Sequence, residues 1–454
     1  MILYVAMQKA IYGTLKAALL FYLKLVGDLE VIGFELNPYD PCVANKMVGG
    51  KQLTVVWHVD DLKISHVNSK VVSKVVKYLD SKYPGVTAKR GKIHEYLGMT
   101  FDFSTPGEVA IDMTKHEDSI FEGFPEKITA TAPTPAADHL FKVRDDADAK
   151  KLPEEQAAQF HHSTAQLLFT SGRVRRDIQT PVSFLTTRVK SPDEDDWGKL
   201  KRVLKYLKGT RGAKLTLRAD SLSIIKWWVD GAFAVHNDCR GQSGGVMSFG
   251  KGAVLSGSLK HKINGKSSTD NEIISVDDFI GQILQKLYFM RAQGYEVEHN
   301  ILFQDNHSSI RLLLNGRKSS TKQTKHMDVR FFFAKDVVNR GDMSIEYCPT
   351  EEMWADVMTK PLQGQAFQKM RSKIMNMPLE FVATNDKKVT VEDTKIAGVS
   401  SKKESIHMNT GVSVHRVTWA KPLQQVWRFR KHKDENPPRH RNNQHLKRLC
   451  AGVC

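Results

Sequence analysis

The sequence predicts a protein of several domains that combine α+β and α/β architecture. The chain has 454 residues, which is more than one hydrophobic core usually serves, so two or three domains are expected. Short strand-like runs bounded by glycine turns alternate along it with longer helix-like runs. Its 41% hydrophobic and 26% charged residues are typical of a soluble globular protein.

Residues 1–130 form the first predicted domain, an antiparallel sheet with two helices. Helix-like periodicity covers 10–32 and 71–83. The strand-like runs, which pair into hairpins, lie at 42–47, 53–59, 62–65, 96–103 and 109–113. Gly49-Gly50 separates the first two of these runs and is typical of a tight hairpin turn.

An adjacent acidic pair, Asp60-Asp61, falls at the far end of the first hairpin. Two neighbouring carboxylates repel each other unless a metal ion or strong hydrogen-bond donors compensate them. A surface β-turn is the alternative, because aspartate is common in turns. The strand–Asp-Asp–strand pattern favours the metal site.

Residues 131–220 form a second, helical segment that begins with a proline- and alanine-rich linker. Helix-like runs cover 156–168, 178–189 and 197–207. The last run carries a basic face formed by Lys201, Arg202, Lys205 and Lys208. This face fits either a solvated helix surface or a surface that follows a nucleic-acid backbone, and the two readings have about equal weight.

Residues 221–365 read as an α/β domain. Strand-like runs cover 224–230, 245–249, 253–257, 301–303 and 344–347. Helix-like runs cover 270–293, 308–314, 326–338 and 352–359. The first three strands with their glycine turns suggest an antiparallel meander.

Four carboxylates of this domain lie where one sheet edge can gather them: Asp230, Glu272, Asp305 and Asp356. Two of them end strand-like runs, and two lie on helix-like runs. Phosphodiester hydrolysis by two-metal chemistry needs two ions roughly 4 Å apart, and Mg²⁺ prefers oxygen ligands. Singly, each acid also fits a turn, a helix cap or a solvated helix position. Together they predict a site for two Mg²⁺ ions, with Mn²⁺ as the alternative metal.

The formal net charge is +17, which favours a polyanionic partner such as nucleic acid. Residues 401–454 alone hold twelve Lys/Arg against three Asp/Glu. Residues 366–454 lose hydrophobic periodicity, so a basic and mostly disordered tail is expected there. The apolar stretch near residues 19–25 is too short to span a bilayer, so no membrane partner is expected. The five scattered cysteines form no C-x-x-C pair.

Short motifs along residues 8–365 resemble, in order, the reverse transcriptase and ribonuclease H parts of copia-type LTR retrotransposon polyproteins. Trp57-His-Val-Asp-Asp-Leu resembles the Y-V-D-D polymerase box, and Leu204-Lys-Tyr-Leu-Lys-Gly-Thr resembles L-R-Y-L-K-G-T. Ser267-Ser-Thr-Asp-Asn-Glu resembles S-S-T-E-A-E, and Ala355-Asp-Val-Met-Thr-Lys-Pro-Leu resembles A-D-I-F-T-K-P-L. Shorter matches are Lys9-Ala-Ile-Tyr-Gly, Tyr96-Leu-Gly-Met, Asp177-Ile-Gln, Gln304-Asp-Asn and Thr324-Lys-His.

The resemblance implies a reverse transcriptase palm at 1–130, a thumb or connection at 131–220 and a ribonuclease H-like mixed sheet with helices at 221–365. Asp230, Glu272, Asp305 and Asp356 would be the ribonuclease H metal ligands, and Asp60 and Asp61 the polymerase pair. The third polymerase aspartate and the fingers region have no counterpart in the sequence, so we expect an incomplete polymerase site. The missing part of the polyprotein is a possible partner.

The resemblance also implies the substrate and the place of action. We expect binding of RNA–DNA hybrid and primer–template nucleic acid. Contacts to these are expected from Tyr96, Gly98, Lys201, Arg202, Lys205 and His326. The expected location is cytoplasmic, in a virus-like particle, or nuclear. For His326, a backbone-bonded helix start is slightly favoured over a role near the metals. Trp227 and Trp228 could stack on bases, although one of two adjacent strand residues should face the core.

Two other functions stay open. The chain could be an inactive relic of a transposable element that folds in part and catalyses nothing. It could also be a noncatalytic nucleic-acid-binding protein, in which case binding would be salt-sensitive and no hybrid would be cleaved.

Overall fold

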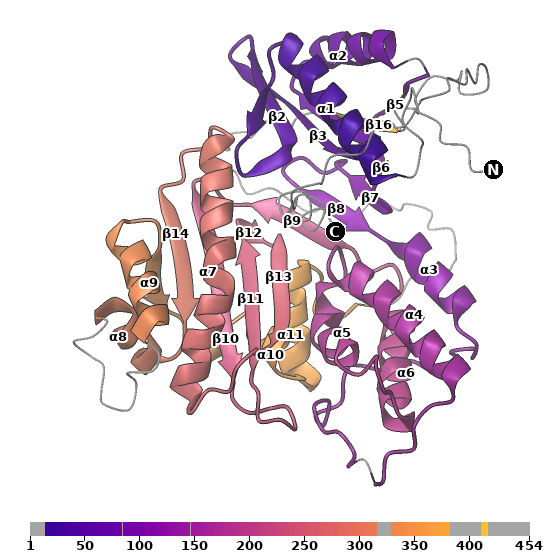
Figure 1. Ribbon diagram of the computed structural model, residues 1–454, viewed down its shortest axis with the longest axis vertical. Helices are drawn as coiled ribbons and strands as arrows, with labels where there is room; N and C mark the ends of the chain where they lie inside the picture. Colours follow the sequence, from indigo (N-terminus) through magenta and orange to yellow (C-terminus); the bar gives the residue numbers. More distant parts are fainter. Residues whose placement is uncertain (1–13, 84, 146, 316–327, 382–409, 416–454) are drawn as a thin grey trace, which may run out of the picture. The chain divides into compact units, whose positions relative to one another are not determined.

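A computed structural model describes residues 14–83, 85–145, 147–315, 328–381 and 410–415 (Figure 1). The chain divides into two compact units between Leu97 and Gly98, and residues 410–415 belong to the first unit. Each unit has its own hydrophobic core, so each is described by itself. None of the helices in the described ranges is long and apolar enough to span a bilayer.

The first unit contains one six-stranded sheet and two helices. The strands lie in the order β1 (Glu35–Asn37), β2 (Asp40–Val48), β3 (Lys51–His58), β4 (Asp61–His66), β16 (Thr410–His415) and β5 (Thr87–Arg90). All neighbours in this sheet are antiparallel. The helices are α1 (Leu15–Val31) and α2 (Ser69–Lys82), and a short strand, β6 (Ile93–Tyr96), follows β5.

The core of the first unit follows from the period of two along its central strands. In β3, Leu53, Val55 and Trp57 are buried, whereas the side chains between them are only partly covered. These side chains pack with Leu25 and Leu29 of α1. The predicted hairpin at Gly49-Gly50 is confirmed, because both glycines adopt positive φ angles (58° and 70°) that suit a two-residue turn.

The second unit begins with a small antiparallel sheet and a group of helices. The sheet contains β7 (Met99–Asp102), β8 (Val109–Asp112), β9 (Leu215–Ala219) and β12 (Gly250–Lys251). The helical elements are α3 (Thr114–Gly123), α4 (Glu154–Ser171), the 3₁₀ turn η1 (Arg176–Ile178), α5 (Gln179–Thr186) and α6 (Glu194–Gly209). Their buried side chains form one cluster that includes Ile120, Phe160 and Leu204.

A mixed five-stranded sheet forms the other half of this unit. Its order is β13 (Leu255–Lys260), β11 (Gln242–Ser248), β10 (Ile224–Ala232), β14 (His299–Gln304) and β15 (Ser344–Tyr347). The first three strands are antiparallel, as the meander prediction required, whereas β14 and β15 run parallel to β10. The remaining elements are α7 (Ser268–Ala292), α8 (His307–Asn315), α9 (Asp328–Asn339), the 3₁₀ turn η4 (Thr350–Glu352), α10 (Asp356–Thr359) and α11 (Gly364–Met375).

Helices cover both faces of this sheet. Two adjacent glycines of β11 show how closely the helices approach it. A Cβ atom at Gly244 would lie 2.6–2.9 Å from atoms of Ala355, Met358 and Thr359, in and just before α10. A Cβ atom at Gly245 would lie 2.4 Å from the Phe279 ring of α7. Because successive strand residues face opposite ways, α7 and α10 must lie on opposite faces. Figure 1 shows α7 running along one face of the sheet.

Two sequence-based boundaries differ from the divisions seen in the structure. The expected break near residue 130 lies instead at Leu97/Gly98, because Ile111, Ile120 and Ile128 pack into the helical core of the second unit. The expected disordered tail from residue 366 contains most of α11, whose Phe367 and Ile374 are buried in the same core. Residues 410–415 of that tail form β16.

Candidate metal centre

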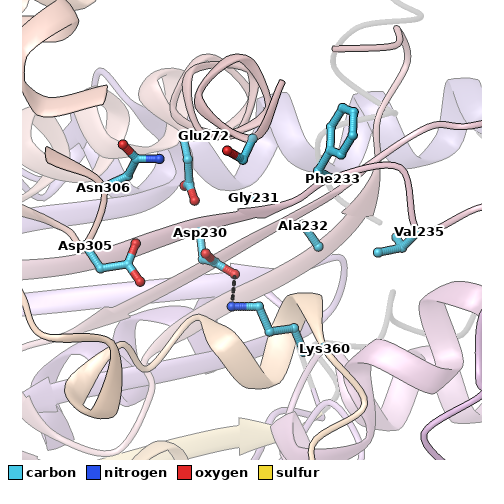
Figure 2. Close-up of a pocket in the computed structure, with 10 residues that line it drawn as sticks. Asp230, Gly231, Ala232, Phe233, Val235, Glu272, Asp305, Asn306 and Lys360 are labelled. Atoms are coloured by element: carbon cyan, nitrogen blue, oxygen red, sulfur yellow. Dashed lines mark ion pairs between the residues drawn. The ribbon is translucent and has the colours of Figure 1, made fainter. Parts of the chain in front are cut away.

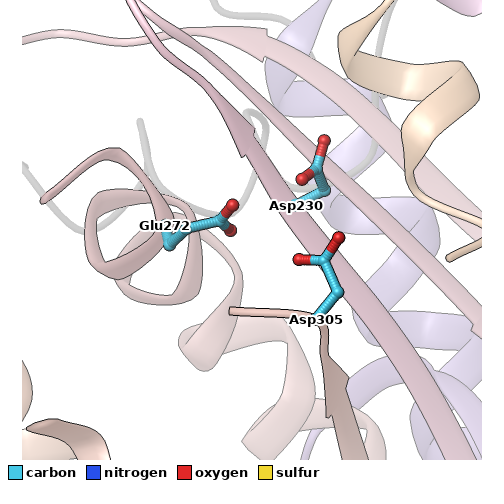
Figure 3. Close-up of side chains that lie close together, drawn as sticks. All are labelled: Asp230, Glu272 and Asp305. Carbon is cyan, nitrogen blue, oxygen red and sulfur yellow. The ribbon is translucent and has the colours of Figure 1, made fainter. Parts of the chain in front are cut away.

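Three of the four predicted carboxylates converge in the second unit. Asp230 lies near the end of β10, and Asp305 directly follows β14. These two strands are parallel, with Trp228 paired to Phe303, so their carboxyl ends meet at one sheet edge. Glu272 reaches the same place from the N-terminal part of α7. Figure 3 shows the three side chains pointing toward one another. One carboxylate oxygen from each residue lies within 4.8 Å of the other two.

The three acids line a cavity of about 560 Å³ (Figure 2). Asp230 is 2% exposed and Glu272 is 6% exposed, whereas Asp305 is partly exposed. The other side chains at the wall are Phe233, Val235, Ser268, Asn306 and Lys360. The cavity lies at the carboxyl ends of parallel strands, beside β10, where the sheet changes from antiparallel to parallel. Ligands of α/β sheets bind at such switch points.

Burial and mutual repulsion make the negative charge here costly. Burial raises the pKa of Glu272 well above its usual range, and the charges of Asp230 and Asp305 raise it further. Gln304 opposes this shift by donating a hydrogen bond from Nε2 to Glu272 Oε2 (3.3 Å). A bound divalent cation would compensate the same charges.

Asp356, the fourth predicted ligand, lies beside this group but outside it. Its Oδ1 atom accepts a hydrogen bond from Lys360 Nζ (2.7 Å), and the same Nζ atom lies 3.5 Å from Asp230 Oδ2 (Figure 2). Burial raises the pKa of Asp356 to about 6, and the charge of Asp230 adds to the shift. Burial opposes the charged form of Lys360, but Asp230 and Asp356 outweigh it and raise the pKa of Lys360.

Lys360 was missing from the sequence prediction, although a signal was present. It follows Asp356 by four residues, and residues at that spacing face each other on a helix. Thr359 was missed too; its hydroxyl donates a hydrogen bond to Asp230 Oδ2. No comparable sequence signal identifies Thr359.

Neither Glu272 nor Asp305 caps a helix in the structure, although the sequence allowed this alternative for both. Ser267 is the N-cap of α7, where its side chain accepts from Asp270 N (3.1 Å), so Glu272 does not cap that helix. At the start of α8, Asn306 Oδ1 accepts from Ser308 N and Ser309 N. Asp305 therefore is not the cap either; its Oδ2 accepts a hydrogen bond from Thr350 Oγ1 (2.9 Å).

These residues fit a divalent cation of the Mg²⁺ type. The donor set is carboxylate oxygen, which Mg²⁺ and Mn²⁺ prefer, and Mg²⁺ needs only a few protein ligands because it keeps several waters. Asp230, Glu272 and Asp305 would hold the metal. Asp356 and Lys360 lie at the border of this group of three acids.

The two tryptophans of β10 do not stack on bases. Trp227 is fully buried and Trp228 is 6% exposed, so this reading was wrong for both residues. The Trp228 ring stacks on the Trp354 ring at 4.2 Å with an interplanar angle of 2°. Trp228 precedes Asp230 by two residues, and Trp354 precedes Asp356 by two. The stack therefore fixes the segments that carry both acids.

Asp60 and Asp61 lie where the sequence predicted, at the tip of the β3–β4 hairpin in the first unit. Val59 and Asp60 form the turn, and His58 pairs with Asp61. Both acids are partly exposed. Within the described residues, groups of three or more potential metal ligands occur only at Asp230, Glu272 and Asp305. The metal role of the pair stays a prediction.

The predicted basic face of α6 is mostly engaged within the protein. Lys201 Nζ bonds Glu126 Oε2 (2.8 Å), Arg202 Nη2 donates to Thr134 Oγ1 (2.9 Å), and Lys208 donates to the carbonyl of Ile128. These bonds tie α6 to residues 126–134, a role that sequence periodicity did not reveal. Contact of Lys201, Arg202 and Lys205 with nucleic acid stays a prediction.

The nucleic-acid contacts predicted at Tyr96, Gly98 and His326 stay predictions. Tyr96 ends β6 in the first unit and is 8% exposed. Gly98 belongs to the second unit and has a φ angle of 76°, which favours glycine. His326 lies outside the described residues.

Curated relatives of this chain are retrotransposon Pol polyproteins. The chain is 24% identical over 367 residues to the retrovirus-related Pol polyprotein from transposon TNT 1-94 of Nicotiana tabacum, covering 80% of this chain and 27% of that protein. It is 23% identical over 376 residues to the Pol polyprotein from transposon RE2 of Arabidopsis thaliana, covering 81% of this chain and 25% of that protein.

A shorter relative is the putative transposon Ty5-1 protein of Saccharomyces cerevisiae, at 25% identity over 283 residues, covering 60% of this chain and 87% of that protein. No protein-family model matches the chain. The chain spans about a quarter of the length of the two plant polyproteins.

Proposed function

We propose that residues 221–365, which lie within the second unit, form a ribonuclease H domain that hydrolyses the RNA strand of RNA–DNA hybrids with Mg²⁺. The observation that carries this proposal is the convergence of Asp230, Glu272 and Asp305 from three separate elements on one cavity. The mixed sheet, with β10 between an antiparallel and a parallel neighbour, supports the ribonuclease H-like fold that the motif resemblance implies. The retrotransposon Pol relatives support the same assignment.

Each residue of the centre has a definable task. When bound, Mg²⁺ would supply electrostatic stabilisation of the attacking water and the leaving oxygen. Asp230, Glu272 and Asp305 would bind it through carboxylate oxygens. Gln304 orients Glu272, and Thr350 orients Asp305, through the hydrogen bonds described above. Such outer contacts fix the direction of ligand oxygens. Lys360 holds positive charge beside Asp230, where a phosphate group could be attracted.

The test is cleavage of a labelled RNA–DNA hybrid in Mg²⁺ by the full chain, by Asp305→Asn and by Asp336→Asn. Asp336 is an exposed aspartate on α9 of the same unit, so its variant controls for the loss of one surface charge. We expect Asp305→Asn to lose at least about 100-fold in rate, because even an outer-shell partner of a metal costs about 10–100-fold. Asp336→Asn should keep the full rate.

The outcomes separate the three functions. Cleavage that survives Asp305→Asn contradicts the site assignment. No cleavage by the unaltered chain favours the inactive relic. If, in addition, hybrid binding is salt-sensitive and unchanged by Asp305→Asn, the noncatalytic nucleic-acid-binding protein is favoured.

RNA-directed DNA polymerisation is a second candidate for the first unit. The Asp60-Asp61 pair at the tip of an antiparallel hairpin supports it. In this proposal residues 1–130, of which 98–130 pack in the second unit, descend from a reverse transcriptase palm, and 131–220 descend from a thumb or connection. A primer-extension assay with RNA template, alone and with the remaining polyprotein part, tests this. We further propose that the protein acts in a cytoplasmic virus-like particle or in the nucleus.

A further inference from the structure

We infer that Asn271 is a positioning residue, which fixes Glu272 of α7 against Asp230 of β10 so that both oxygens reach one cation. This inference rests on the metal centre of the proposed function but not on hybrid cleavage itself. Asn271 is neither one of the residues that line the cavity described above nor one of the three candidate ligands.

The first support is a hydrogen bond that joins the two acid-bearing elements. Asn271 Nδ2 donates to the backbone carbonyl of Ala232 (3.1 Å), which lies 39 residues away in the chain. Asn271 precedes Glu272 by one residue, and Ala232 follows Asp230 by two. The bond therefore ties helix to strand within two residues of each acid. Asn271 is 1% exposed, so water does not compete for this bond.

The second support is the closeness of the two backbones at the same point. A Cβ atom at Gly231 would lie 2.5 Å from Asn271 O and 2.7 Å from Ser275 Oγ. Ser275 Oγ in turn donates to Asn271 O (2.9 Å). Only glycine allows β10 to approach α7 this closely, and Gly231 is the residue directly after Asp230. The spacing between the two acids is thus set by contact between backbones, and Asn271 holds that contact.

The third support is that asparagine is a costly choice at this position. Its Oδ1 atom is buried and has no hydrogen-bond donor within the described ranges. Burying an unpaired polar atom lowers stability, so the amide needs a compensating purpose.

The chain offers a closely matched control in Asn300 of β14. Asn300 Nδ2 also donates to a backbone carbonyl, that of Asp342 (2.8 Å), and its Oδ1 also has no donor among the described residues. It is 6% exposed and belongs to the same unit. Asn271→Ala and Asn300→Ala thus remove the same chemical group from the same kind of environment. Only the first is beside the acids.

The experiment measures Mg²⁺ binding by calorimetry, with Mg²⁺ alone as the probe, and chemical unfolding of both variants. Similar shifts of the unfolding midpoint are expected for the two. Asn271→Ala should bind Mg²⁺ more weakly than the unaltered chain, by at most the roughly 10–100-fold that loss of a direct hydrogen-bond partner of a ligand costs, whereas Asn300→Ala should bind it equally well. Equal Mg²⁺ affinity of the two variants would overturn the inference.

Two further outcomes are informative. If the unaltered chain binds Mg²⁺ but cleaves no hybrid, the proposed function fails and the inference is still decided by the two variants. If the unaltered chain binds no Mg²⁺, the inference is overturned. Should Asn271→Ala not fold, Gly231→Ala changes the same contact from the strand side. It should weaken Mg²⁺ binding, and unchanged binding would contradict the positioning role.

Discussion

Two clusters of buried charge in the second unit differ in what balances them. Around Arg175, the guanidinium binds Asp177 through two hydrogen bonds (3.0 and 2.8 Å) and Glu117 through a third (3.1 Å). Tyr206 also donates to Asp177 (2.6 Å). At the sheet edge, Asp230, Glu272 and Asp305 face one another, and Lys360 at their border is 41% exposed. The first cluster contains its own cation at its centre, whereas the second does not.

The pKa shifts show the consequence. Burial works against the charged form of Asp177, but Arg175 outweighs it and lowers the pKa of Asp177 below its usual range. Glu272 is similarly buried, yet its pKa is raised. Glu117 lies between the two cases, since burial raises its pKa while Arg175 opposes the rise. Burial of acids alone therefore does not indicate a functional site. Buried acids that lack a central positive charge do indicate one.

Removal of the central cation should have the largest effect. Arg175→Met leaves Asp177 and Glu117 buried without their partner, and breaking a buried pair in this way costs about 3–5 kcal/mol in the free energy of unfolding. Urea titration measures the loss. The control is Arg218→Met, which removes a surface arginine that is 49% exposed and 3.5 Å from Glu108. If Arg175→Met loses no more unfolding free energy than this control, Arg175 does not balance the buried acids, and the contrast between the two clusters fails.

One acid of each cluster, Asp356 and Asp177, should also contribute to the pH dependence of stability in opposite directions. In the metal-free protein, Asp356 has a folded pKa of about 6 against an ordinary 3.8. The folded state then binds more protons than the unfolded state between these values, so stability falls as pH rises from 4 to 6. The full shift corresponds to about 2–3 kcal/mol. Asp177, whose pKa is lowered, contributes stability at higher pH that is lost below its usual range.

Unfolding at a series of pH values, without metal, measures this difference. Asp356→Asn should flatten the fall between pH 4 and 6. Glu272 acts in the same direction, so part of the fall should persist at higher pH. The raised pKa of Asp356 would be contradicted if the stability of the unaltered chain rises from pH 4 to 6 and Asp356→Asn shows the same pH dependence.

Removal of Lys360 should have a smaller effect and make the acidic cluster more attractive to a cation. Lys360→Met removes the positive charge beside Asp230 and Asp356. Because this side chain is partly exposed, the change in metal-free stability should be a loss of about 1 kcal/mol or less. Mg²⁺ affinity, measured by calorimetry, should rise by up to about fivefold. Weaker Mg²⁺ binding would show that Lys360 supports the metal ligands instead of opposing the cation.

The smallest effect is expected at the hairpin of the first unit. Asp60→Asn and Asp61→Asn should leave hybrid cleavage by the chain within about twofold, because surface substitutions away from a site typically change free energies by less than ~0.5 kcal/mol. The measurement is the hybrid-cleavage rate already described. A large loss in either variant would mean that the pair takes part in the same reaction.

The candidate site was easier to predict from the sequence than its surroundings. Strand-end and helix positions indicated that Asp230, Glu272 and Asp305 could meet, because parallel strand ends share one edge. The contact of Asn271 with Ala232, and the stack of Trp228 on Trp354, depend on tertiary packing between distant segments, which periodicity does not encode.

The limits of the units were the least predictable part of the fold. The helix at Gly364–Met375 was missed because the basic composition of the tail outweighed the spacing of Phe367, Met370 and Ile374. That spacing of three and then four residues is itself helical. The break at Leu97/Gly98 was missed because strands 96–103 and 109–113 look alike whichever core they join. The local sequence pattern predicts a helix or strand, but only tertiary packing decides which domain that element joins.

The most direct test of the central claim is Mg²⁺ calorimetry on the full chain and on Asp305→Asn. If Asp230, Glu272 and Asp305 form one centre, the unaltered chain binds Mg²⁺ and the variant binds it at least about 100-fold more weakly. Equal binding by both proteins, or none by the unaltered chain, would show that the three acids do not act together on a metal ion.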